Sequence, residues 1–181
     1  MDTLEAINTR RSIRKYKKEL ISDETVMDIL KAADHAPSAN NGKPWEFIII
    51  RDRETLYRMS VICKHWTPLK NTNLCIVVVA NLREYPCSHI DFYIQDCAAC
   101  TENLLLAAHA LGLGAVWMGC CPAEERMQAI REVLEIPPSI MPFSVVPMGV
   151  PDEKTDFRKK ISSVIIHYNK YKQYRRNHLH V

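Results

Sequence analysis

The run Leu74-Cys75-Ile76-Val77-Val78-Val79-Ala80 is apolar at every position. Its β-branched side chains favour a strand, and a strand without a polar face has to be buried on both sides. We therefore expect residues 74–80 to form a central strand of the fold. The chain has 181 residues, of which 47% are hydrophobic. This length suffices for one domain with a sizeable core, or at most for two small ones.

Shorter patterns on either side of this run predict the other elements. Strands are expected at residues 45–50, 115–118 and 143–148. Helices are expected at residues 3–8, after an N-cap at Ser22, at residues 53–63, and from Pro122 in a first turn to about residue 134. Because strands and helices alternate around one core, the sequence predicts an α/β or α+β sandwich.

Residues 88–111 have the longest helical pattern, and its second half is apolar on nearly all sides. Such a helix is buried in a large core or in an interface, and Gly112 is expected to end it. The helix contains a C-x-x-C pair, Cys97 and Cys100, in its middle. Redox-active cysteines usually lie at a helix N-terminus, where their pKa is lowered, so we interpret this pair as small buried side chains.

The composition narrows the class of protein. The N-terminus lacks the apolar run of a signal peptide, and no apolar run approaches the ~18 residues of a membrane span, so we expect a cytoplasmic protein. Seven cysteines, an odd number, are expected to be free thiols. The histidines show no metal-ligand spacing, and no metal site is expected.

The stretch Arg10-Arg11-Ser12-Ile13-Arg14-Lys15-Tyr16 is the strongest candidate for a binding site. In an extended segment Arg10, Ser12 and Arg14 share one face, and two guanidinium groups beside a hydroxyl can bind a phosphate. The alternative is a solvated basic surface. The chain has only five glycines and no glycine-rich phosphate loop, so a bound phosphate would depend on these arginines.

A polar loop bounded by prolines, residues 37–44, is a second candidate. Its hydroxyl and amide side chains can contact a ligand, and Gly42 can adopt a left-handed turn. The alternative is a simple connection between a helix and a strand. No residue pattern supplies a nucleophile or an acid–base pair, so an enzyme with this sequence would take its chemistry from a cofactor.

Four motifs together resemble the nitroreductase family of FMN-dependent oxidoreductases. In chain order they are R-R-S-I-R-K-Y at residues 10–16, P-S-x-x-N-x-x-P-W at 37–45, N-L-L-L-A-A-x-x-L-G-L-G with W-M-G at 103–119, and H-Y-N-K-Y at 167–171. Each motif is short, but the ordered set spans nearly the whole chain.

The resemblance implies one FMN-binding domain over residues 1–181. It implies an α+β sandwich with a central, mainly antiparallel sheet flanked by helices. It also implies a homodimer in which the C-terminal extension, from about residue 154 to 181, is exchanged between subunits. Each of two FMN sites would then be built by both chains at their interface. The aromatic, apolar residues near the C-terminus suit such packing on a partner.

The same resemblance assigns site residues. Arg10, Arg11 and Ser12 would lie at the FMN phosphate, and Arg14 near the N1 and O2 edge of the flavin ring. Pro37, Ser38 and Asn41 would come from the other subunit, and Met118, Gly119 and Cys120 would line the N5 side.

The sequence departs from the family pattern at a few positions. The C-terminal phosphate contacts would be Lys154 or Arg158, because an aspartate, Asp156, stands where the family often has an arginine. Lys43 stands where a glutamine is common.

The function implied is transfer of hydride from NADH or NADPH through flavin N5 to a small acceptor, such as a nitroaromatic or a quinone. No side chain is assigned a catalytic role. One alternative is another flavin reaction on the same fold, reductive dehalogenation or flavin fragmentation. A second, from a different class, is a nucleic-acid-binding module that uses the two basic ends of the chain.

Overall fold

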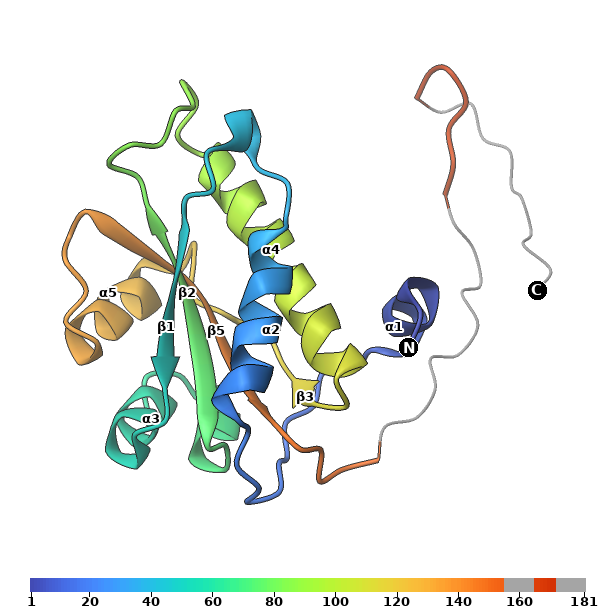
Figure 1. Cartoon of the computed structure of the whole chain (residues 1–181). Coiled ribbons are helices and arrows are strands. Elements are labelled where there is room, and N and C mark those ends of the chain that lie inside the picture. The colour runs from blue at the N-terminus through green and yellow to red at the C-terminus, as the bar shows by residue number, and fades with distance from the viewer. Residues whose placement is uncertain (155–164, 172–181) are drawn as a thin grey trace.

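The structure is a computed structural model, and it describes residues 1–154 and 165–171. It has a central sheet with helices on both faces (Figure 1). The helices are α1 (Thr3–Thr9), α2 (Asp23–Asp34), α3 (Arg53–Ser60), α4 (Phe92–Ala110) and α5 (Glu124–Val133), with short 3-10 helices η1 (Ala39–Asn41) and η2 (Thr67–Lys70). The strands are β1 (Trp45–Ile50), β2 (Leu74–Asn81), β3 (Gly114–Ala115), β4 (Met118–Gly119) and β5 (Ile140–Gly149).

The sheet confirms the α+β expectation. Its strands follow the order β1-β2-β5-β3, β4 also pairs with β5, and every pairing is antiparallel. The strand predicted from the apolar run, β2, lies in the interior of the sheet, and its first seven residues are all buried. Within the described part of the sheet, β1 forms one outer edge.

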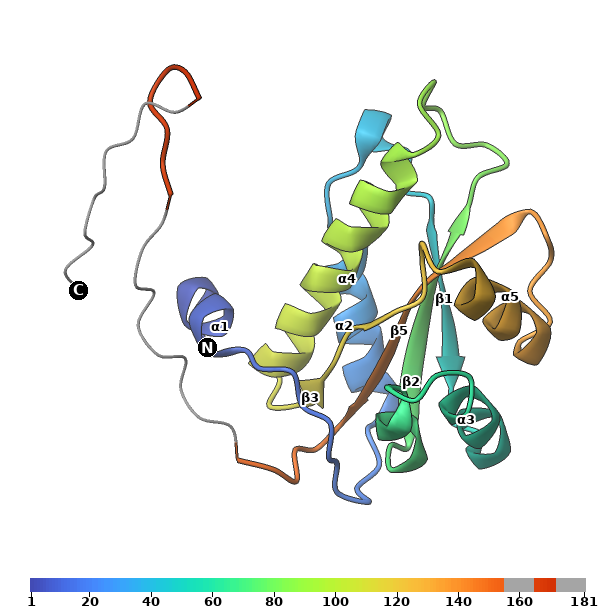
Figure 2. The same cartoon turned by 180° about the vertical axis from the view of Figure 1, so that it is seen from behind.

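Two helical layers bury the two faces of the sheet. Ile76 and Val78 of β2 join a core with α2 and α4, whereas Val77 and Val79 join a second core with α3, η2 and α5. Figures 1 and 2 show these layers from opposite sides. Each such side chain stabilises the fold by roughly 1.5–3 kcal/mol through its burial. Because both faces are covered, a polar side chain on either face of β2 would be buried without a hydrogen-bond partner.

Several element ends confirm the sequence signals. Ser22 caps α2, and its Oγ accepts a hydrogen bond from the backbone N–H of Thr25 over 3.2 Å. Gly112 ends α4 with a φ of +80°, a left-handed conformation that costs glycine little. None of the helices in residues 1–154 and 165–171 combines the length and apolar character needed to cross a bilayer.

Other predicted bounds were wrong. The helix predicted at 88–111 begins at Phe92, because residues 88–91 form a turn. The helix predicted from Pro122 begins at Glu124, and Pro122 lies in the turn that precedes it. The helix predicted at 53–63 ends at Ser60. The short strand predicted at 115–118 is two strands, β3 and β4, each paired with a different part of β5.

Two glycines allow the chain between α1 and α2 to lie against the sheet. A Cβ at Gly114 would lie 2.6 Å from Cβ of Ile13, and one at Gly149 would lie 2.7 Å from Cβ of Tyr16. Both distances are far shorter than a normal contact. The close approach of residues 10–16 to β3 and β5 therefore requires glycine at these positions.

We predict that Gly114→Ala lowers the free energy of unfolding by about 1–3 kcal/mol, because the new methyl group overpacks against Ile13. Denaturant unfolding measures the change. The matched control is Gly119→Ala, where a Cβ meets nothing within 4 Å. Equal stability of the two variants in the cofactor-free protein would contradict the close packing described here.

Candidate active site

Residues 10–16, the basic segment, are held on the edge of the sheet by backbone hydrogen bonds. The N–H of Ile13 donates to the carbonyl of Ala115 over 3.0 Å, and the N–H of Lys17 donates to Val150 over 2.9 Å. The carbonyl of Lys15 accepts from Asp152 over 2.9 Å. In Figure 2 the segment passes beside β3. The arginines therefore project from a backbone that the sheet fixes.

Tyr16 anchors the inner side of the basic segment. Its side chain is buried, and its hydroxyl lies 2.6 Å from the carbonyl of Ile13 and 3.1 Å from that of Pro147. Burial raises the pKa of Tyr16 well above its usual value, so the hydroxyl stays a neutral donor. Ile13 is also buried. The segment thus turns its apolar residues inward and leaves Ser12 and Arg14 exposed.

A carboxylate that the sequence did not single out holds the backbone next to Arg14. Oε1 of Glu153 accepts hydrogen bonds from the N–H of Arg14 over 2.5 Å and from that of Lys15 over 3.2 Å. Lys154, one of the predicted phosphate contacts, is the next residue and is exposed. Arg158 and Asp156 lie outside the described residues.

The three arginines of the segment have different surroundings. The guanidinium of Arg10 is mostly buried, and its Nε lies 3.4 Å from a carboxylate oxygen of Glu102 on α4. Arg14 donates to the carbonyl of Ser12 over 3.3 Å and is otherwise exposed. Arg11 donates to the carbonyls of Asn8 and Arg10 at the end of α1, over 3.0 and 2.7 Å. These contacts make Arg11 a cap for α1.

The charge of the segment also affects a neighbouring histidine. Nε2 of His109, near the end of α4, lies 2.8 Å from the hydroxyl of Thr9. Burial lowers the pKa of His109, and the positive charges of Arg10 and Arg11 lower it further. The neutral ring therefore adds no positive charge at neutral pH.

The predicted residues 118–120 lie close to the basic segment. Ile13 binds Ala115, three residues before Met118, and β4 continues along β5 from there. Met118 and Cys120 are buried, and burial raises the pKa of the Cys120 thiol to about 12. Gly119 is half-buried, its carbonyl accepts from Arg126 over 2.9 Å, and a Cβ there would point into open space. The chain leaves room for a ligand above Gly119.

The loop at residues 37–43 lies far from the basic segment within one chain. The N–H of Ala39 binds Asp96 near the start of α4, whereas Thr9 binds His109 near its end. Asp96 and His109 are thirteen residues apart (109 − 96), and at 1.5 Å per residue they are about 20 Å apart along the helix. In Figure 1 the loop lies beside the upper end of α4 and α1 beside the lower end. Pro37, Ser38 and Asn41 are therefore not brought to the arginines of their own chain.

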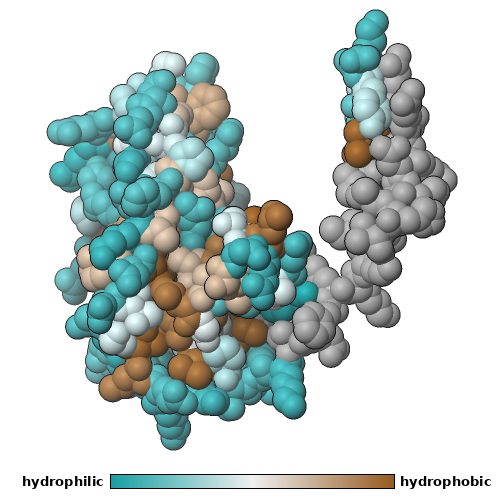
Figure 3. Space-filling view, turned by 45° about the vertical axis from the view of Figure 1, so that its right-hand side comes forward, coloured by the Kyte–Doolittle hydropathy of each residue, from teal (hydrophilic) through white to brown (hydrophobic). Residues whose placement is uncertain are grey.

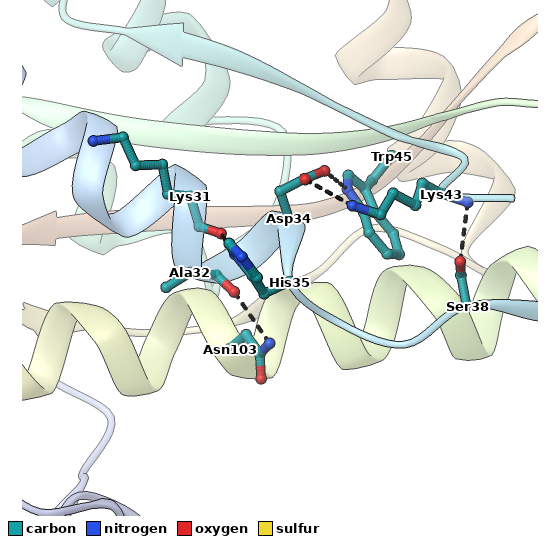
Figure 4. A network of polar contacts seen from close by, with 8 residues as sticks. All are labelled: Lys31, Ala32, Asp34, His35, Ser38, Lys43, Trp45 and Asn103. Carbon is teal, nitrogen blue, oxygen red and sulfur yellow. Dashed lines mark hydrogen bonds and ion pairs between the residues drawn. The ribbon is translucent and has the colours of Figure 1, made fainter. Parts of the chain in front are cut away.

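Polar contacts fix the shape of this loop (Figure 4). Oγ of Ser38 accepts from the N–H of Lys43 over 3.0 Å. The carboxylate of Asp34 accepts from Nζ of Lys43 over 2.8 Å and from Nε1 of Trp45 over 3.0 Å. These two hydrogen bonds lower the pKa of Asp34, the one from Lys43 more strongly. Lys43 thus has a structural partner of its own.

The left-handed turn expected at Gly42 was wrong. Gly42 has a φ of −74°, whereas Asn40, Asn41 and Lys43 have φ values of +50°, +53° and +39°. Gly42 is needed for a different reason, because a Cβ there would lie 2.7 Å from Cδ of Pro86. Non-glycine residues in this conformation are strained, and such strain is often found at functional sites.

The remaining polar groups offer no further chemistry. Cys97 and Cys100 lie in the middle of α4 as predicted, and both are buried and free. Burial raises both pKa values, that of Cys100 to about 12. Among residues 1–154 and 165–171, no three His, Cys, Asp or Glu side chains are grouped so that they could hold a metal ion.

Sequence reasoning missed the carboxylates that organise these residues. Glu153, Glu102, Asp96 and Asp34 all contact candidate site residues. No local motif marks them, because three of the four contacts join residues far apart in the chain. The fourth contact joins Asp34 to Lys43, nine residues apart. The only feature of the sequence that pointed to this contact was the position of Lys43 in a predicted loop.

Comparisons with known proteins identify the family and the fold. The model of the nitroreductase family matches residues 7–74 and 63–150. An Archaeoglobus fulgidus protein, provisionally named NADH dehydrogenase/NAD(P)H nitroreductase, is 51% identical over 86% of this chain and 89% of its own. An FMN-dependent nitroreductase of known structure from Clostridium difficile is 30% identical, with a TM-score of 0.84 over 93% of this chain and 100% of its own.

A provisionally named nitroreductase from Desulfovibrio desulfuricans was solved in complex with FMN. It is 31% identical, with a TM-score of 0.76 over 89% of this chain and 94% of its own. The family match covers more than half of the chain, and the sheet and flanking helices are those of these structures. The chain therefore belongs to the nitroreductase family of enzymes.

Proposed function

We propose that the protein is an FMN-dependent oxidoreductase that passes electrons from NADH or NADPH to a small acceptor, such as a nitroaromatic or a quinone. Bound FMN would supply the redox chemistry by accepting hydride at N5 and passing it on. The observation that carries the proposal is that the basic segment is bonded to Ala115, four residues before Gly119, where a Cβ would meet nothing within 4 Å. The similar structures with FMN in their names support the choice of cofactor.

The residues present fit the phosphate end of FMN. Arg10 and Ser12 would bind the phosphate, and Lys154 could add a charge from the adjoining strand end. Arg10 now lies beside one carboxylate, Glu102, which is nearly half exposed. A phosphate dianion would bind the guanidinium more strongly than this carboxylate does, because it offers more charge and more acceptor oxygens.

The residues also fit the flavin ring. A flat ring system can lie above Gly119, where any larger residue would place a side chain. Arg14, held through its N–H by Glu153, would lie at the N1 and O2 edge. A fixed cation there stabilises the negative charge of a reduced flavin.

No side chain of the proposed site is needed as an acid or a base. The thiol of Cys120 stays protonated because burial raises its pKa to about 12. Its role is to pack behind β4 and hold the backbone of Gly119 in place. The chain's own contribution is therefore binding, orientation and one fixed cation.

We infer that the active form is a homodimer. Pro37, Ser38 and Asn41 lie too far from the arginines to join them in one chain, and a second copy would supply them. On α1 and at the end of α4, Leu4, Ile7 and Leu111 are exposed apolar side chains. Figure 3 shows hydrophobic residues gathered on α1 and on the body beside it. A partner subunit that covers this surface would bury them.

The C-terminal exchange is part of the same proposal. The outer edge of β1 has no partner strand among the described residues. A free sheet edge can accept an added strand. The sequence has an apolar run at residues 164–166, and an exchanged tail would place such a run on the partner.

We predict that the purified protein binds FMN and becomes yellow. Under anaerobic conditions NADH or NADPH should bleach the flavin absorbance, and a nitroaromatic or a quinone should then restore it. Absorbance spectroscopy measures both half-reactions. Protein that takes up no FMN, or flavin that neither nicotinamide reduces, would overturn the proposal. Recovery with a halogenated aromatic alone would favour reductive dehalogenation.

The double variant Arg10→Ala/Arg14→Ala should weaken FMN binding by about a hundredfold or more, because charge-assisted hydrogen bonds are lost at both ends of the cofactor. Quenching of FMN fluorescence measures the affinity. Arg58→Ala/Lys64→Ala removes the same charge from exposed positions outside the proposed site and serves as the control. Unchanged affinity in the first variant would place the phosphate elsewhere.

Leu4→Lys/Ile7→Lys should convert the dimer to a monomer, since lysines at an apolar interface are costly to bury. Sedimentation velocity measures the mass of the particle, and FMN binding should weaken when the dimer is lost. Tyr57→Lys/Val61→Lys changes two exposed residues of comparable apolar character on and just after α3, and should leave the dimer intact. A dimer that survives the α1 substitutions would refute this interface.

A further inference from the structure

We propose that Asp96 and Tyr85 are positioning residues that hold the 37–43 loop in the shape required by the flavin of the partner subunit. This inference rests on the proposed function, in which that loop reaches across a dimer interface. Neither residue belongs to a sequence motif noted above, and neither would touch the cofactor itself. Both act through the backbone of the loop.

Asp96 is a buried carboxylate that accepts hydrogen bonds from two different donors. Its side chain lies on α4, and the residue is only 5% exposed. Oδ1 accepts from the N–H of Ala39 over 3.0 Å, and Oδ2 accepts from the hydroxyl of Tyr85 over 2.5 Å. Each oxygen therefore connects α4 to a different segment of the chain.

Tyr85 holds the loop from its other side. It belongs to the connection between β2 and α4, and this connection packs directly on the loop. A Cβ at Gly42 would lie 2.9 Å from Cε2 of Tyr85, and Nδ2 of Asn40 donates to the carbonyl of Pro86 over 3.3 Å. Burial is the main cause that raises the pKa of Tyr85, and the hydrogen bond to Asp96 raises it further, so the hydroxyl stays protonated and remains a donor.

The loop needs this external support. Asn40, Asn41 and Lys43 have left-handed backbone conformations, which asparagine tolerates better than other non-glycine residues, so Lys43 is the least suited of the three. The 3-10 helix η1 has no side-chain hydrogen bond at its N-cap. A strained segment keeps its shape only when its surroundings fix it. Asp34 fixes the end near Lys43 (Figure 4), and Asp96 fixes the end near Ser38.

The two supports differ in their exposure to solvent. The Asp34–Lys43 pair is exposed, with side chains 51% and 40% accessible, so salt screens it. Asp96 is buried, and among the described residues it forms no ion pair within 4 Å. A buried carboxylate without a cation costs free energy, and its neutral donors have to compensate. A carboxylate presents one acceptor oxygen to each of the two donors, whereas an asparagine in the same position would turn its NH2 group, itself a donor, toward one of them.

Tyr85→Phe tests the role most cleanly, because it removes one hydroxyl from a half-buried side chain. We predict about tenfold weaker FMN binding, which is the size expected for the loss of one hydrogen bond. Tyr57→Phe, on the exposed face of α3, is the control and should leave the affinity unchanged. Asp96→Asn should weaken FMN binding similarly. The double variant should be little worse than either alone, because Tyr85 acts through Asp96.

Mixed dimers separate a positioning role across the interface from a general effect on folding. In the split arrangement one subunit carries Arg10→Ala/Arg14→Ala and the other carries Tyr85→Phe. Both defects then fall on the same flavin, and the second flavin has an intact basic segment and an intact loop. In the same-chain arrangement all three substitutions are on one subunit, and each flavin has one defect.

The measurement is FMN bound per dimer, at a concentration that saturates the wild-type protein but not the Tyr85→Phe homodimer. Two different affinity tags isolate the mixed dimers. We predict about one FMN per dimer in the split arrangement and clearly less than one in the same-chain arrangement, where the site with the altered loop is only partly filled. The reverse result would show that Tyr85 acts on its own chain's site and would overturn the inference.

Two further results have distinct meanings. Unchanged FMN affinity in Tyr85→Phe, with the wild-type protein binding FMN as a dimer, overturns this inference and leaves the proposed function standing. A wild-type protein that binds no FMN, or that remains a monomer, overturns the proposed function and with it this inference.

Discussion

Backbone hydrogen bonds between the N-terminal basic segment and the sheet are the constraint on which the site depends. Residues with this much positive charge repel one another and gain little from burial, so they cannot order themselves. Pairing with Ala115 and Val150, together with the buried hydroxyl of Tyr16, fixes the backbone instead. Gly114 and Gly149 make the contact close enough to form. The sheet in turn is ordered because β2 and β5 are buried on both faces.

This arrangement separates the two candidate halves of the site along α4. The basic segment lies near the end of the helix, and the 37–43 loop lies near its start. The contact points of the two halves, Asp96 and His109, are about 20 Å apart along this helix, so the loop does not reach the arginines of its own chain. The loop can nevertheless serve a flavin if a second subunit brings it to the first. The length of α4 thus links the proposed dimer to the proposed chemistry.

Acidic residues give the site its order, although its ligand would be an anion. Glu153 holds the N–H of Arg14, Glu102 lies beside Arg10, and Asp96 holds the loop. The carboxylates of Glu153 and Asp96 bind backbone N–H groups and leave guanidinium groups available. Glu102 is the exception, since it partly occupies Arg10. Phosphate binding would therefore have to compete with one ion pair, in which Arg10 is mostly buried and Glu102 is nearly half exposed.

Local patterns were enough to predict the core, and the motif resemblance gave the family. The apolar run of β2 predicted its two buried faces, and Ser22 and Gly112 predicted helix ends. Alternation predicted one face shared by Arg10, Ser12 and Arg14, of which Ser12 and Arg14 are exposed and Arg10 is mostly buried. The contacts of Glu153 and Asp96 could not be predicted, because they join residues that are far apart in the chain. Glu153 is 139 positions from Arg14, and Asp96 is 57 positions from Ala39. The left-handed turn was expected at Gly42 and lies instead at Asn40, Asn41 and Lys43, where contacts with residues distant in the chain, such as that of Asn40 with Pro86, could not be predicted locally.

A crystal structure of the protein grown with FMN tests the central claim most directly, because it locates both halves of the site at once. The account predicts the phosphate on Arg10 and Ser12 of one subunit and the ring above Gly119 of that subunit, with Ser38 and Asn41 contributed by its partner. A flavin bound by the basic segment and the loop of a single chain, or bound away from the arginines, would contradict it.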